Sequence, residues 1–166
     1  CYLKLNKPAG FISSNIDEMY PSLLKLVPFK YFRADLNIVG RLDQDTEGLI
    51  LLTNDGAFIH HVTHPKREIE KTYLVNHDKP LMKIALDKGI AFKDYTTKPI
   101  QLTIIDEHNC QITITEGKYH EVKRIIHHLG SEVIKLTRIK IAEITLEDLP
   151  MGGIKELTKE ELDSLK

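Results

Sequence analysis

The strongest constraint on the fold of this chain is a run of four apolar residues, Leu49-Ile50-Leu51-Leu52. A strand with one solvated face alternates apolar and polar residues, whereas a strand buried on both faces is apolar throughout. The run therefore predicts a central strand covered on both faces, closed by the turn residues Thr53-Asn54-Asp55-Gly56. It is far shorter than the ~18 apolar residues that a membrane helix needs.

The other segments mix strand and helix patterns. Cys110, Ile112 and Ile114 alternate with polar residues, which predicts a half-buried strand. Apolar residues at i, i+3, i+4 and i+7 predict an amphipathic helix from Val122 to Leu129, ended by Gly130. Further strands are expected at 2–5, 71–75 and 132–141, and further helices within 21–29, 56–64 and 81–87 and at the capping box of Thr158 and Glu161. We predict one α+β domain over 1–166, a mixed or mainly antiparallel sheet with flanking helices.

The charge of the chain is nearly neutral in total but segregated along the sequence. The net charge is −1, yet residues 117–140 hold six bases and two acids, and residues 141–166 hold three bases and seven acids. A basic face for RNA can therefore coexist with a neutral total. Two cysteines are too few for a disulfide framework and no apolar leader is visible, so a reducing, cytoplasmic setting is expected, with no membrane partner.

The densest functional signal is the loop Gly40-Arg41-Leu42-Asp43-Gln44-Asp45-Thr46-Glu47-Gly48. A calcium loop would need a bidentate Glu at its twelfth position, where Asn54 stands, and helices on both sides. Paired carboxylates for glycoside chemistry and a solvated turn both remain open from these residues. A zincin pair at His60 and His64 lacks the required Glu and a third ligand, so no metal site is predicted.

A second signal is the stretch Glu116–Arg124, which opens the amphipathic helix. The polar side of this helix carries Lys123, Arg124, His127 and His128. Cations near a helix N-terminus suit phosphate, and the aromatics Tyr119 and Tyr73 among the bases suit stacking on unpaired RNA bases. A solvated helix face explains the same residues about equally well.

Taken together, these segments resemble a known family. Gly40-Arg41-Leu42-Asp43, followed by Gly48 through Gly56, is similar to the signature of the RsuA-type rRNA pseudouridine synthases. The resemblance continues in the family's order through Asn6–Gly10, Glu70–Val75, Glu116–Arg124 and Leu136–Arg138. Tyr119-His120 resembles the small-subunit branch, whereas Glu121 stands where the family usually has Gln.

The resemblance implies an enzyme with the pseudouridine synthase fold that isomerises a specific uridine of small-subunit (16S) rRNA. It assigns catalysis to Asp43 as nucleophile or base, to Tyr73 as stacking group and proton acceptor, and to Lys123 as the partner of Asp43. The residues expected to bind the RNA or its base are Arg41, Leu136, Lys118, His120, Arg124 and Arg138. The isomerisation has no redox step and no net hydrolysis, so no cofactor or metal is implied.

The expected partner is ribosomal RNA, possibly within an assembling small subunit, and the enzyme is expected to be monomeric. The resemblance also implies an S4-like RNA-binding domain upstream of Cys1. A large-subunit (23S) rRNA synthase of the same family is the alternative enzyme. A non-catalytic RNA-binding module is the alternative from another class, and the presence of Asp43 and Tyr73 argues against it.

Overall fold

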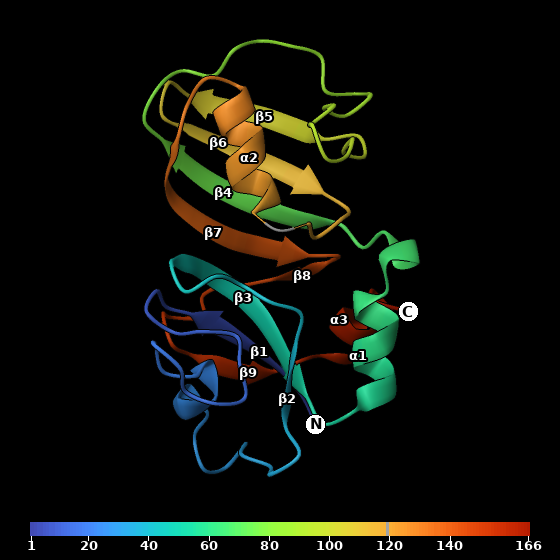
Figure 1. Ribbon diagram of the computed structural model, residues 1–166. Helices are drawn as coiled ribbons and strands as arrows, with labels where there is room; N and C mark the ends of the chain where they lie inside the picture. Colours follow the sequence, from blue (N-terminus) through green and yellow to red (C-terminus); the bar gives the residue numbers. More distant parts are fainter. Residues whose placement is uncertain (119) are drawn as a thin grey trace.

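The computed structural model describes residues 1–118 and 120–166. In this part of the chain, nine strands form one sheet with the order β5-β6-β4-β7-β3-β1-β9, while β2 lies beside β3 and β8 beside β7 (Figure 1). The strands are β1 (Tyr2–Lys7), β2 (Asn37–Val39), β3 (Thr46–Thr53), β4 (Lys71–His77), β5 (Gln101–Asp106), β6 (Asn109–Ile114), β7 (Val133–Ile141), β8 (Ile144–Thr145) and β9 (Ile154–Glu156). The helices are α1 (Gly56–Thr63), α2 (Glu121–His128), α3 (Lys159–Asp163) and the 3₁₀ turns η1 (Leu23–Leu26) and η2 (Pro65–Arg67). Strands β3 and β7 pair in parallel and the other paired strands are antiparallel, so the predicted α+β fold with a mixed sheet is confirmed.

The apolar run Leu49–Leu52 forms the centre of β3, and both faces of the strand are buried. Ile50 and Leu52 belong to one apolar core, whereas Leu49 and Leu51 belong to a second core on the opposite face. None of these four side chains is more than 1% exposed. The prediction of a central strand covered on both faces is therefore confirmed.

Each core is closed by its own helices. The predicted apolar stripe of α2 is buried in the core that also contains side chains of β4 and β6, and Gly130 follows the helix with a φ of 88°. Val62 of α1 and Leu165 beyond α3 lie in the second core. Figure 1 shows α2 against the half of the sheet that contains β4 to β7, and α1 and α3 beside the other half. No helix in the described ranges has the length and apolar character required to cross a bilayer.

The helix predicted at 81–87 is wrong, because this segment is irregular. Its backbone bonds to distant residues instead of its own turn: Met82 N–H donates to the Leu129 carbonyl (2.9 Å), and the Leu86 carbonyl accepts from Ile100 N–H (3.1 Å). Leu81 and Leu86 are buried, but a spacing of five does not match a helical period. The edge strand β5 and the short strands β8 and β9 were not anticipated, because they lack a clear alternation of buried and exposed positions.

The parallel contact between β3 and β7 depends on Gly48. A Cβ at this position would lie 2.2 Å from the backbone oxygen of Arg138, and the φ of Gly48 is 111°. Only glycine adopts this φ without strain and allows the two backbones to approach so closely. The contact places the loop before β3 next to β7 and explains why β3 begins at Thr46, inside the predicted loop.

Candidate active site

The loop between β2 and β3 carries Asp43 and is held by Lys7, the last residue of β1. Lys7 Nζ donates to the backbone oxygens of Thr46 (2.7 Å), Pro8 (3.0 Å), Asp43 (3.1 Å) and Gln44 (3.4 Å). The Lys7 residue is 0% exposed. A buried cation that binds carbonyls at and beyond Asp43 fixes the course of the loop and leaves the Asp43 carboxylate free to act.

The environment of Lys7 changes its acid strength. Burial lowers the pKa of Lys7 from 10.5 to about 8, and the carboxylates of Asp45, Asp43 and Glu47 oppose this decrease. At neutral pH most of the Lys7 population therefore still carries the ammonium that ties down the loop. Above pH 8 most of the Lys7 side chains are neutral amines, which have two N–H donors for these carbonyls where the ammonium has three.

The N-terminal end of α2 faces this loop and presents two basic side chains to Asp43. Oδ2 of Asp43 lies 3.0 Å from Nε2 of His120 and 3.4 Å from Nζ of Lys123. Lys123 also lies 3.1 Å from each carboxylate oxygen of Asp45. The Asp43 side chain is 42% exposed, so a substrate can reach it. The structure therefore forms the expected contact between Lys123 and Asp43 and places His120 on the carboxylate as well.

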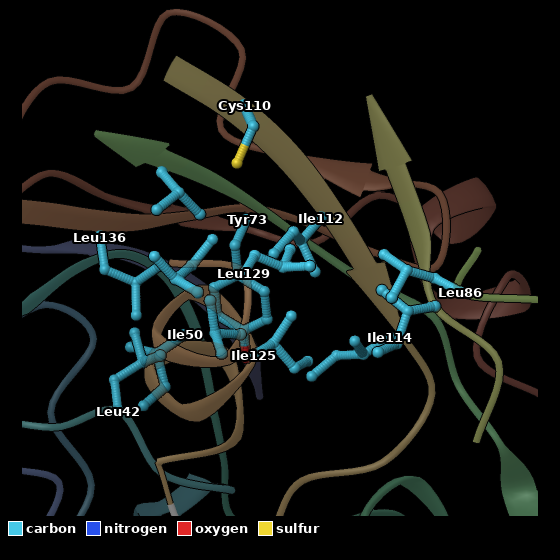
Figure 2. Close-up of a cluster of buried hydrophobic side chains, with 14 of the residues drawn as sticks. Leu42, Ile50, Tyr73, Leu86, Cys110, Ile112, Ile114, Ile125, Leu129 and Leu136 are labelled. Atoms are coloured by element: carbon cyan, nitrogen blue, oxygen red, sulfur yellow. The ribbon is translucent and has the colours of Figure 1, made fainter. Parts of the chain in front are cut away.

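Two further predicted residues lie on strands beside the loop. Leu136 on β7 is paired with Thr46 of β3 on one side and with Val75 of β4 on the other. Tyr73, two residues before Val75, is 8% exposed and shares the apolar core with Leu42 and Leu136, as Figure 2 shows. The strand order β4-β7-β3 therefore gathers Tyr73, Leu136 and the loop of Asp43 in one region of the sheet.

The other predicted RNA-binding residues lie in different environments. Arg41 and Lys118 are exposed, and Lys118 Nζ lies 5.7 Å from the ring centre of Tyr95. Arg124 binds both carboxylate oxygens of Asp94, at 2.6 and 3.1 Å. Arg138 is 4% exposed, and its Nε donates to the Leu49 carbonyl at 2.8 Å, which ties β7 to β3.

Sequence patterns did not identify three residues at or beside this site: Lys7, Asp45 and Asp94. The sequence assigns no role to Lys7, because nothing local in Asn6–Gly10 indicates that its ammonium is buried against a distant loop. Asp45 was noted only as one of three loop carboxylates, and Asp94 was not singled out at all. Tyr119, which was expected to stack on RNA bases, lies outside the described residues.

The arrangement suits carboxylate chemistry. Among the described residues, no group of three or more His, Cys, Asp or Glu side chains is placed to hold a metal ion. His120 and Lys123 contact the Asp43 carboxylate, and the loop that carries Asp43 is fixed by the buried Lys7. A positioned and accessible carboxylate beside the apolar core that contains Tyr73 and Leu136 can act as a nucleophile or as a base.

Comparisons with known proteins agree with this geometry. Residues 1–128 match the family model described as RNA pseudouridylate synthase. The chain is similar to the ribosomal small subunit pseudouridine synthase A of Haemophilus influenzae, with 41% identity over 99% of this chain and 73% of the relative. The protein of the same name from Escherichia coli K12 is 39% identical, over 99% of this chain and 73% of the relative.

Solved structures give the same result. A structure titled "Crystal structure of pseudouridylate synthase" superimposes with a TM-score of 0.92 and 40% identity, covering 99% of this chain and 73% of that chain. The structure titled "Human RNA Pseudouridylate Synthase Domain Containing 1" superimposes with a TM-score of 0.59 over 99% of this chain and 90% of that chain. Its identity is 14%, so this second likeness concerns the fold alone.

Proposed function

The chain belongs to the RNA pseudouridylate synthase family, and we propose that it isomerises a specific uridine of small-subunit (16S) ribosomal RNA to pseudouridine. The observation that carries the proposal is the accessible Asp43 carboxylate, held between His120 and Lys123 on a loop fixed by Lys7. The names of the relatives, at about 40% identity over nearly the whole chain, support small-subunit rRNA as the substrate.

The reaction breaks the bond between N1 of uracil and C1′ of ribose, turns the base, and joins C5 to C1′. Asp43 either attacks C1′ or removes a proton from C2′ as the glycosidic bond breaks. Lys123 and His120 hold this carboxylate in place for both routes. The atoms of substrate and product are the same, so the enzyme has to keep water away from the intermediate and hold the detached base.

Tyr73 and Leu136 are proposed to hold the uracil. A base inside a duplex is inaccessible, so the target nucleotide has to leave its stack before it reaches Asp43. Tyr73 would stack on the base and accept the C5 proton through its hydroxyl, while Leu136 packs against the ring. Both side chains are nearly buried and lie beside the Asp43 loop, which supports this assignment.

Phosphate contacts are assigned to basic side chains around the site. Arg41, Lys118 and Arg124 provide positive charge for the RNA backbone. Arg138 is proposed to support the site from within the sheet, where its bond to the Leu49 carbonyl ties β7 to β3. We place this activity in the cytoplasm, in a monomer that acts on rRNA during small-subunit assembly. An S4-like domain preceding residues 1–166 would add RNA affinity without changing the chemistry.

The proposal is tested by mapping pseudouridine in purified 16S and 23S rRNA after incubation with the protein. We expect one modified position in 16S rRNA, and none with Asp43→Asn, whose amide is a poor nucleophile and base. RNA binding and the unfolding transition of the variant should match those of the wild type. Modification confined to 23S rRNA would replace the substrate assignment, and an Asp43→Asn variant with more than about a tenth of wild-type activity would refute the role of Asp43, since tenfold equals ~1.4 kcal/mol of barrier.

A further inference from the structure

Glu121, the first residue of α2, is a buried carboxyl group that the proposed chemistry does not use. The residue is 3% exposed. Its Oε2 accepts a hydrogen bond from the backbone N–H of Lys118 at 3.2 Å, but its Oε1 has no donor among the described residues. A buried carboxylate oxygen without a donor is costly, so the ionised form of Glu121 fits its surroundings poorly.

A second carboxyl group lies close to Glu121. The Glu116 side chain lies within hydrogen-bonding range of Glu121, and its Oε1 accepts from the backbone N–H of Lys98 at 2.7 Å. Two ionised carboxylates repel one another and neither can donate. One proton shared between Glu116 and Glu121 removes the repulsion and satisfies the buried Oε1.

The charged groups around the pair do not replace this proton. Glu121 is influenced by ionisable side chains from the segment before α2, from β4, from the β4–β5 connection and from α2 itself: Glu116, Lys118, Lys71, Tyr95, Lys98 and Arg124. The cations in this set favour the ionised form. Burial and the Glu116 carboxyl outweigh them and raise the pKa of Glu121 from 4.5 to about 7.

The carboxyl pair holds the turn that carries the basic side chains of the site. Glu121 bonds Lys118 twice, since its backbone N–H donates to the Lys118 carbonyl at 3.1 Å and its carboxyl accepts from the Lys118 N–H. Glu116 ties the same segment to Lys98. His120 immediately precedes Glu121, and Lys123 lies two residues after it, so a shift of this turn moves both contacts to Asp43.

We propose that Glu121 is a positioning residue that has to be protonated, donating to Glu116, for His120 and Lys123 to meet Asp43. The inference rests on the proposed function, because it assigns a role in the same active site. Glutamine has nearly the same shape and donates from its amide at any pH. Glu121→Gln should therefore supply the donor permanently and preserve the site where the wild type loses its proton.

The test is the pH profile of kcat/KM for pseudouridine formation, measured from pH 6 to pH 9 on the full chain. We expect the ratio of wild type to Glu121→Gln to be near one at pH 6 and to fall about tenfold by pH 8, because a group with a pKa near 7 loses most of its proton over this range. In Glu116→Gln the amide of residue 116 donates to Glu121 instead, so kcat/KM of this variant should also depend less on pH than that of the wild type. Glu143→Gln, which alters an exposed glutamate, should keep the wild-type profile.

A ratio that is constant with pH would overturn the inference. If the wild type modifies no RNA at any pH, the proposed function fails. The shared proton is then tested by measuring the free energy of unfolding against pH in the absence of RNA. The folded state binds more protons than the unfolded state between pH 4.5 and about 7, so the free energy of unfolding should fall with rising pH in the wild type relative to Glu121→Gln. Parallel unfolding profiles of the two proteins would refute the shared proton.

Discussion

The ammonium of Lys123 lies closer to Asp45 than to Asp43. It is 3.1 Å from both carboxylate oxygens of Asp45 and 3.4 Å from Oδ2 of Asp43, while His120 lies on that same oxygen at 3.0 Å. Asp43 therefore shares Lys123 with a neighbouring carboxylate two residues along its own loop.

We expect Asp45→Asn to lower kcat about two- to fivefold, because Lys123 loses the partner that holds it beside Asp43 and an exposed ion pair contributes at most ~1 kcal/mol. KM and the RNA affinity should change little. Single-turnover kinetics on 16S rRNA, with Asp45→Glu as the charge-preserving control, check this. An unchanged kcat in Asp45→Asn would show that Asp43 alone holds Lys123.

The lowered pKa of Lys7 predicts how the free energy of unfolding changes with pH. Its folded pKa of about 8 is below its ordinary value of 10.5, so the folded state binds fewer protons than the unfolded state between these pH values. The free energy of unfolding of the wild type should therefore rise with pH over this window relative to Lys7→Met. Denaturant unfolding of both proteins at pH 7.5 and pH 10 measures the difference, and a constant difference would contradict the lowered pKa.

Gly48→Ala should destabilise the protein by about 3 kcal/mol or more. The added methyl group would meet the Arg138 backbone oxygen at 2.2 Å, and the backbone of β7 cannot move away without breaking its pairing with β3. Gly56→Ala is the matched control, because a Cβ there has no neighbour within 4 Å. Thermal unfolding of the two variants should differ clearly, and equal melting temperatures would show that β3 and β7 separate easily.

Arg124 and Lys123 are adjacent but should behave differently. Arg124→Ala should weaken binding to all RNAs alike and lower the slope of log K against log salt by roughly 0.7–0.9, whereas Lys123→Ala should mainly lower kcat. Asp94→Asn removes the carboxylate that occupies Arg124 and should strengthen RNA binding. Titrations at two salt concentrations measure all three variants. Equal losses of affinity and turnover in Arg124→Ala and Lys123→Ala would contradict this division.

Much of the fold follows from patterns that are local in the sequence. The apolar run of β3, the stripe of α2 and the capping box of Thr158 and Glu161 all appear as expected. Each pattern lies within one element, where the period of burial equals the period of the backbone. The helix predicted at 81–87 is absent, because the backbone of this segment bonds to Leu129 and Ile100, which are distant in the sequence, and not to its own turn.

The sequence also indicated the reactive position of Asp43 and the family that the chain resembles. It did not indicate the partners of the buried charges. Lys7 meets the carbonyls of a loop about 36 residues away, and Lys4 on β1 reaches Glu161 of α3 at 2.8 Å across 157 residues. Lys123 meets Asp43 and Asp45 because the order β4-β7-β3 brings the start of α2 over the loop. The sequence by itself determined which segments are strands, helices and reactive loop, since these depend on local periodicity. Only the tertiary structure decided which charges share a buried space, because desolvation and Coulomb energies depend on distances that the strand order sets.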